Sequence, residues 1–182
     1  MGKYKKDWWK KVKANQASLL NKEDLKQLLA KCKDAEERIA LLLLYYAGLK
    51  VNELLELRVG DIRQEGKTIA LNIPEKGESR LIYLPLDDFT KEIVEFVKER
   101  PSEFRLMLRM RTCYQVKDFI YRVSDKTLTP AFFRHNRIAK LAQQGVNLAL
   151  LKAFTGIKNI NQLEPYLQFS SIKSKKMAKI VE

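Results

Sequence analysis

A lysine stands in an unusual place for a charged residue, in the elbow between two apolar stretches of the chain. The segment LLLLYYAGLKVNELLELRVGDI covers residues 41–62, and its apolar run ends at Gly48, two residues before Lys50. Glycine commonly ends a helix in the left-handed conformation, and Asn52 is expected to cap a short helix directly afterwards. An ammonium group is costly to bury at such an elbow without a partner. The sequence therefore raises the question of which partner Lys50 has at this elbow.

The overall charge of the chain also indicates a polyanionic partner. Its 182 residues include 35 Lys and Arg against 22 Asp and Glu, which gives a net charge of +13. Such an excess is typical of proteins that bind nucleic acid, and solubility is the alternative explanation. Residues 1–17 form a lysine-rich arm that contains Trp8 and Trp9, and residues 171–182 form a lysine-rich tail. The arm is expected either to follow phosphates or to dock on the domain through its tryptophans.

Composition argues against several other classes of site. Two cysteines, Cys32 and Cys113, do not make a disulfide framework, and we expect reduced thiols in a cytosol. The single histidine lies in no cluster with zinc-ligand spacing, so no metal and no small-molecule cofactor are expected. The longest apolar run, residues 39–49, is shorter than the roughly 20 residues of a membrane span. No signal-peptide pattern is expected either, and no membrane association.

The hydrophobic periodicity predicts one mostly helical domain, residues 18–169, with a small antiparallel sheet. Two β-rich segments, 67–73 and 79–85, are joined by PEKGE and predict a hairpin. Thr129 is expected to cap a helix that has Pro130 at its first position and runs to Gln144. The other expected helices cover residues 20–32, 34–47, 53–59, 90–100, 114–124, 147–156 and 161–170. The expected core includes Phe132, Phe133, Leu141 and residues 148–151.

Three segments carry a set of cationic residues followed by a tyrosine. The first is AGLKVNELLELRVGDI with Lys50, and the second is PEKGESRLIYLP with Lys76 and Arg80. The third is TPAFFRHNRIAKLAQQGVNLALLKAFTGIKNINQLEPY, with Arg134 and, 32 residues later, Tyr166. In this order they resemble the catalytic domain of tyrosine recombinases (phage-type integrases) over about residues 20–169. The resemblance implies an α+β, mostly α-helical fold with a small antiparallel β-hairpin or sheet.

The resemblance also implies a double-stranded DNA partner and a defined reaction. Members of the family cut a strand by tyrosine attack on phosphorus, which forms a 3′-phosphotyrosyl bond and releases the 5′-hydroxyl. Two arginines stabilise charge on the nonbridging oxygens, and a lysine protonates the leaving oxygen. Carried onto this sequence, the nucleophile is Tyr166, one arginine is Arg134 and the lysine is Lys76. His135 is expected to pack or hydrogen-bond rather than to catalyse. Candidate DNA contacts are Lys50, Lys76, Arg80, Arg134, Arg137 and Lys140.

The chain departs from this family at three catalytic positions. Lys50 stands where an arginine is expected, so the charge remains but the bidentate fork is lost. Ala131 replaces an expected His or Lys, and Ile157 replaces an expected His or Trp, so neither offers a donor. Loss of one such donor commonly costs about 10²–10³ in rate. Pro165 directly precedes Tyr166 and restricts the backbone before it, which is a further departure.

The regions outside the matched domain raise two further expectations. Only the basic arm, residues 1–17, precedes the first matched helix, whereas the family usually has a DNA-clamping domain there. DNA binding without this clamping domain is expected to be weaker and less selective than in the family, and to depend steeply on salt. Active relatives exchange a C-terminal segment, so the tail, residues 170–182, is a candidate for self-association on DNA. A cytoplasmic location with the nucleoid is expected.

These observations leave three functions open. The first is a DNA-binding protein on a recombinase fold whose catalytic site is degenerate. The second is an active, divergent site-specific recombinase in which other cations replace the missing groups. The third is a basic module that binds RNA or an acidic protein. Affinity for duplex DNA separates the third function from the others, and a covalent protein–DNA adduct separates the second from the first.

Overall fold

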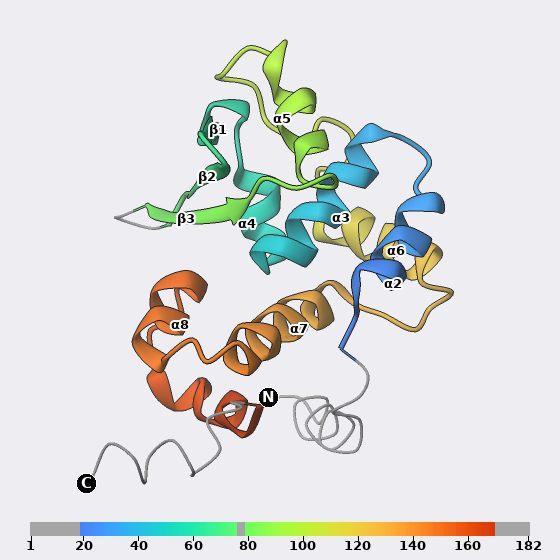
Figure 1. Cartoon of the computed structure of the whole chain (residues 1–182). Coiled ribbons are helices and arrows are strands. Elements are labelled where there is room, and N and C mark those ends of the chain that lie inside the picture. Colours follow the sequence, from blue (N-terminus) through green and yellow to red (C-terminus); the bar gives the residue numbers. More distant parts are fainter. Residues whose placement is uncertain (1–18, 76–78, 170–182) are drawn as a thin grey trace, which may run out of the picture.

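The computed structural model describes residues 19–75 and 79–169, arranged as in Figure 1. The predicted arm (residues 1–17), the predicted tail (residues 170–182) and Lys76 lie outside the described residues. The predicted class, mostly helical with a small antiparallel sheet, is confirmed. The elements are α2 (Lys22–Ala30), α3 (Ala35–Ala47), α4 (Val51–Glu56), η1 (Val59–Asp61), β1 (Ile62–Glu65), β2 (Thr68–Ile73), β3 (Arg80–Pro85), α5 (Lys91–Lys98), α6 (Cys113–Val123), α7 (Pro130–Gln143), α8 (Leu148–Thr155), η2 (Ile160–Gln162) and η3 (Glu164–Phe169).

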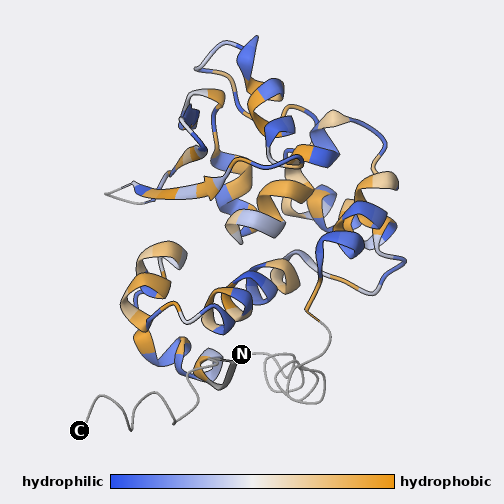
Figure 2. Ribbon diagram, viewed as in Figure 1, coloured by the Kyte–Doolittle hydropathy of each residue, from blue (hydrophilic) through white to orange (hydrophobic). Residues whose placement is uncertain are grey.

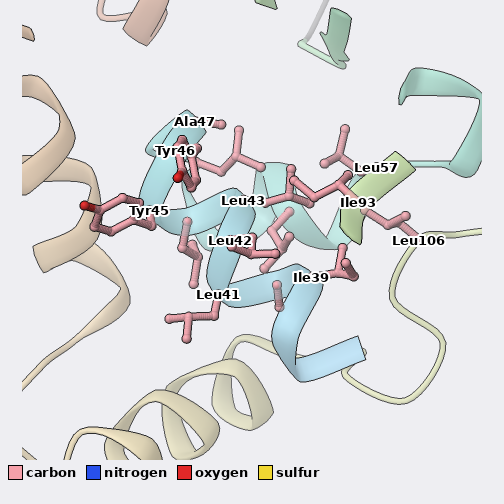
Figure 3. Packing of buried hydrophobic residues seen from close by; sticks show 14 of the residues in the cluster. Ile39, Leu41, Leu42, Leu43, Tyr45, Tyr46, Ala47, Leu57, Ile93 and Leu106 are labelled. Atoms are coloured by element: carbon pink, nitrogen blue, oxygen red, sulfur yellow. The ribbon is translucent and has the colours of Figure 1, made fainter. Parts of the chain in front are cut away.

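Helix α3 forms the centre of the main hydrophobic core. Asp34 caps its N-terminus by accepting the backbone N–H of Glu37. The helix ends at Gly48, whose φ of +62° is the predicted left-handed conformation. Every residue from 39 to 47 is buried, and Figure 3 shows their side chains pointing away from α3 in several directions. Since burial of apolar surface is the dominant favourable term in folding, the elbow that follows α3 is held by a rigid element.

The sheet has three antiparallel strands in the order β1–β2–β3. The predicted hairpin is confirmed as β2 and β3, which pair Thr68 with Pro85 and Ile73 with Arg80. Strand β1 was not predicted, because its sequence IRQE buries only Ile62 and has no alternating apolar pattern. The register places Arg80 at the turn end of the hairpin, and β3 packs beside α8 (Figure 1).

Helix α7 joins the main core to a second, smaller hydrophobic cluster. Thr129 caps it and Pro130 occupies its first turn, as predicted. Phe133 reaches into the main core next to α3, whereas Ile138 faces the second cluster. Figure 2 shows hydrophilic and hydrophobic residues alternating along α7, as expected for a helix with two buried sides and an exposed one. The buried members of the second cluster are Ile138, Ala139, Leu141, Ala142, Leu151, Leu163 and Tyr166.

The start of α4 differs from the sequence-based expectation. The helix begins at Val51 and its N-cap residue is Lys50, not Asn52. The cause is Glu53, whose carboxylate accepts the Lys50 backbone N–H at 2.8 Å and so fixes the first turn two residues earlier.

The C-terminal part of the described chain differs in two further respects. Leu150 was expected in the core but is 59% exposed, because α8 has eight residues and buries only Leu151 and Thr155. Phe132 and Leu148, also expected in the core, are half-buried. The segment 161–170, expected as one helical piece, is a pair of 3₁₀ helices up to residue 169.

Within the described ranges no helix has the length and apolar character needed to cross a bilayer.

Candidate active site

Lys50 and Glu53 form the first part of the candidate site, at the elbow between α3 and α4. The ammonium nitrogen of Lys50 lies 3.3 Å from Glu53 Oε1, and the lysine side chain is 54% exposed. The Glu53 carboxylate itself is only 8% exposed. Lys50 is therefore neither buried nor unpaired, and it can turn its charge toward an external anion.

Arg134, on the second turn of α7, is tied to both elements that flank it. Its Nη1 donates to the carbonyl of Gly48 at 2.9 Å, and its Nη2 donates to the carbonyl of Thr155. Its Nη1 also lies 3.7 Å from Glu53 Oε2. Burial lowers the pKa of the Arg134 guanidinium, and the charge of Glu53 partly offsets that effect. The predicted arginine is thus fixed next to the elbow.

Arg80, the first residue of β3, completes a cluster of cations around Glu53. Its Nη2 lies 3.2 Å from Glu53 Oε2, and its Nη1 lies 3.1 Å from Glu75 Oε1. The arginine side chain is 9% exposed. A Cβ atom added at Gly156 would overlap Arg80 Nη1 and Glu75 Oε1, so the guanidinium lies directly against the glycine. The structure therefore brings Lys50, Arg80 and Arg134 to the same carboxylate.

Tyr166, the predicted nucleophile, lies in η3 and is buried in the second cluster. Its hydroxyl forms a short hydrogen bond with Nδ1 of His135, and the two rings are stacked with centroids 6.1 Å apart. Burial raises the pKa of Tyr166, while the positive charge of Arg134 lowers it in part. Burial therefore disfavours the phenolate, which is the more nucleophilic form.

The remaining predicted site residues on α7 lie against α3. Lys140 donates to the hydroxyl of Tyr45 at 2.7 Å and lies over its ring, and Figure 3 shows Tyr45 pointing toward α7. Burial, reinforced by the charge of Arg137, lowers the pKa of Lys140 to about 8. The Arg137 guanidinium lies 5.4 Å from the ring of Phe154, and burial lowers its pKa. Lys140 thus lies at the α3–α7 interface, and Arg137 lies against Gly48 at the end of α3 and against Phe154 of α8.

Two of the substituted positions, Ala131 and Ile157, supply no polar group to the site. Ala131 is exposed on the first turn of α7, and Ile157 is half-buried beside the second cluster. The predicted lysine, Lys76, lies outside the described residues. The described part of the site therefore consists of cations, carboxylates and a buried tyrosine that is hydrogen-bonded to His135.

Sequence reasoning gave no role to the two carboxylates of the site. The spacing of Glu53, three residues after Lys50, is that of a capping box and could have indicated the contact. Glu75 was not singled out, because its contact with Arg80 crosses the hairpin and depends on the strand register.

Comparison with known proteins places this geometry in a family. The model of the phage integrase family matches residues 18–171. Tyrosine recombinase XerA of Saccharolobus solfataricus is 27% identical over 158 residues, which is 86% of this chain and 54% of that protein. The structure of XerH site-specific recombinase bound to difH substrate matches with a TM-score of 0.71 at 21% identity, over 90% of this chain and 54% of that one.

The catalytic domain of bacteriophage HP1 integrase is matched over most of its own length. Its TM-score is 0.61 at 16% identity, over 89% of this chain and 94% of that domain. By contrast, the chain spans about half the length of XerA. The likeness in structure concerns the catalytic domain and its fold. Since the family model covers nearly all of the described residues, this chain belongs to the phage integrase family.

Proposed function

We propose that this chain is a DNA-binding protein that holds backbone phosphates at the Lys50–Arg80–Arg134 cluster and whose catalytic site is degenerate. The observation that carries the proposal is the convergence of these three cations on Glu53, at distances of 3.2 to 3.7 Å. A phosphodiester is the anion that the family acts on. Lys76, Arg137 and Lys140 remain candidate contacts, and the basic arm, residues 1–17, and tail, residues 170–182, contribute further lysines.

The expected binding is mainly electrostatic. A net charge of +13 and contacts to phosphate rather than to base edges predict affinity for many duplex sequences. Dissociation constants on the order of 10⁻⁴–10⁻⁶ M are typical of such binding at physiological salt. We place the protein in the cytoplasm with the nucleoid, and we assign self-association on DNA to the tail.

Degenerate catalysis is proposed for two physical reasons. Lys50, Ala131 and Ile157 lack the fork and the donors that a phosphoryl-transfer site uses to stabilise charge. Tyr166 is buried, and its raised pKa makes the attacking phenolate scarcer. These effects act in one site and do not simply add, but each lowers the rate of strand cleavage.

A second candidate function, an active divergent recombinase, is favoured by the contact between His135 and Tyr166. An imidazole nitrogen hydrogen-bonded to a phenol can accept its proton as the phenol attacks. Arg134 is ordered by two backbone carbonyls, as a residue that holds a phosphate in a fixed orientation must be. On this reading the loss of three groups is compensated by other cations of the site.

A module that binds RNA or an acidic protein is the third candidate, and composition is its support.

A covalent-trap experiment separates these functions. Duplexes enriched from a random pool are nicked through the recovered sites, so that a cleaved fragment diffuses away, and protein–DNA adducts are sought by denaturing electrophoresis. Enrichment without an adduct supports the proposal. An adduct that is absent from Tyr166→Phe establishes the active recombinase instead. Failure to enrich any duplex points to RNA or an acidic protein.

A further inference from the structure

Arg80 is the most enclosed of the three cations around Glu53, yet its hydrogen bonding is incomplete. Among the described residues, Nε and Nη1 of Arg80 are buried and find no partner with hydrogen-bond geometry. Oε1 of Glu75, 3.1 Å from that Nη1, is likewise buried and has no hydrogen bond in the described part of the chain. Buried N–H groups of a native protein are nearly always satisfied, so an unsatisfied arginine calls for an explanation such as a missing ligand.

The charges around Arg80 indicate the sign of that ligand. Three cations, Lys50, Arg80 and Arg134, are in ionic contact with two carboxylates, Glu53 and Glu75. One positive charge is left over in a site where two of the cations are almost completely buried. Buried charges require a counter-charge, so the cluster is suited to an additional anion.

Gly156 leaves the space in which the Arg80 guanidinium lies. Gly156 ends α8 with a φ of +64°, which favours glycine, and its missing side chain also admits Arg80 Nη1 and Glu75 Oε1. The turn that follows α8 leads to Ile157, one of the three substituted positions. Arg80 therefore lies against the residue that precedes Ile157 and shares the Glu53 carboxylate with Lys50.

We propose that Arg80 supplies a second guanidinium to the bound phosphate, in place of the arginine that is absent at position 50. We propose in addition that Glu75 occupies the place of that phosphate until DNA binds. An arginine offers a planar fork that matches two phosphate oxygens, which Lys50 cannot do. The Glu75 side chain is 29% exposed, so it can leave Arg80 toward solvent. This inference rests on the proposed DNA-binding function and assigns its phosphate ligands.

The test compares the effects of neutralising each partner on DNA affinity. Binding of a fluorescent 20-base-pair duplex is measured by anisotropy at several salt concentrations for Arg80→Gln and Glu75→Gln. Arg80→Gln should weaken binding at least about tenfold and lower the salt slope by about one, as loss of one phosphate contact predicts. Glu75→Gln should strengthen binding about threefold or more, because the anion no longer competes.

A matched pair of control variants removes the effect of net charge alone. Arg122 and Glu37 also form an arginine–glutamate ion pair, with Nη2 and Oε1 at 2.5 Å. Glu37 is in the first turn of α3, about 15 Å along this helix from its C-terminal end, and Arg122 contacts it from α6. Arg122→Gln and Glu37→Gln should each change the affinity less than about twofold. The inference is overturned if the Arg80 and Glu75 variants shift binding no more than these controls. It is also overturned if both site variants weaken binding, since that result indicates a purely structural ion pair.

A second measurement distinguishes failure of this inference from failure of the proposed function. The Nε–H signal of Arg80, assigned by its loss in Arg80→Lys, is followed by ¹⁵N NMR during titration with inorganic phosphate. A saturable shift, larger in Glu75→Gln, supports the anion site even if the wild-type chain binds no duplex, in which case only the DNA function is wrong. An unmoved Arg80 signal together with unchanged DNA affinity in Arg80→Gln refutes the inference while leaving DNA binding intact. Thermal unfolding of each variant checks that it is folded.

Discussion

Replacing Gly156 by alanine tests whether the position of Arg80 controls DNA binding. Gly156 has a φ of +64°, and its added Cβ would overlap Arg80 Nη1 and Glu75 Oε1. Gly66, in the turn between β1 and β2, has a φ of +59° and has no atom within 4 Å of an added Cβ. Gly66→Ala therefore imposes the same backbone conformation on alanine without displacing Arg80.

The two substitutions are expected to differ in binding more than in stability. An alanine in the left-handed conformation costs about 1–2 kcal/mol, and for a chain of this size each kcal/mol lowers Tm by roughly 2–4 °C. The atoms that Gly156→Ala displaces are the ends of flexible side chains, so its stability loss should exceed that of Gly66→Ala only slightly. A displaced Arg80 loses a charge-assisted hydrogen bond to phosphate, worth about 1.5–3 kcal/mol, or roughly 10–100-fold in Kd.

Differential scanning calorimetry gives the two Tm values, and duplex titration at fixed salt gives the two affinities. We expect similar Tm values and a DNA affinity that falls only in Gly156→Ala. If both variants bind DNA as the wild type does, the guanidinium against Gly156 does not contact phosphate and the reasoning fails. If Gly66→Ala loses as much affinity as Gly156→Ala, the loss comes from lower stability rather than from Arg80.

Three further predictions use other parts of the site. Lys50→Ala should weaken binding to all duplex sequences alike and lower the salt slope by about one, and an unchanged slope in salt titrations would exclude a phosphate contact there. The triple variant Lys50→Arg, Ala131→His, Ile157→His should restore measurable strand cleavage in the nicked-duplex assay, and no gain would mean that the tyrosine is misplaced for attack. Lys140 has a pKa of about 8 in the folded chain against 10.5 when exposed, so the unfolded chain binds more protons between these pH values. The free energy of unfolding should therefore rise from pH 8 to 10.5 more steeply in wild type than in Lys140→Gln, and parallel denaturant-derived curves would contradict this assignment.

The sequence by itself determined most of the fold, because the relevant signals are local. Capping residues such as Thr129 and terminating glycines such as Gly48 and Gly156 set helix limits through their own backbone conformations and hydrogen bonds. The apolar run 39–47 identified the central helix, and the hairpin followed from two β-rich segments around a turn. Strand β1 was missed, since it forms through pairing with β2 rather than through any pattern of its own.

The sequence also provided the candidate site residues, through the order and spacing of three motifs, but not their mutual contacts. Lys50, Arg80 and Arg134 come from an elbow, a strand and a helix that are distant along the chain, and only packing of α7 and the sheet against the end of α3 brings them to Glu53. Burial of Tyr166 against His135 likewise depends on how η3 packs on α7. Residue type determined which chemistry was available. The tertiary structure decided which cations share the Glu53 carboxylate and which hydroxyl is buried. The reason is that desolvation and ion pairing depend on distances between segments that are remote in sequence.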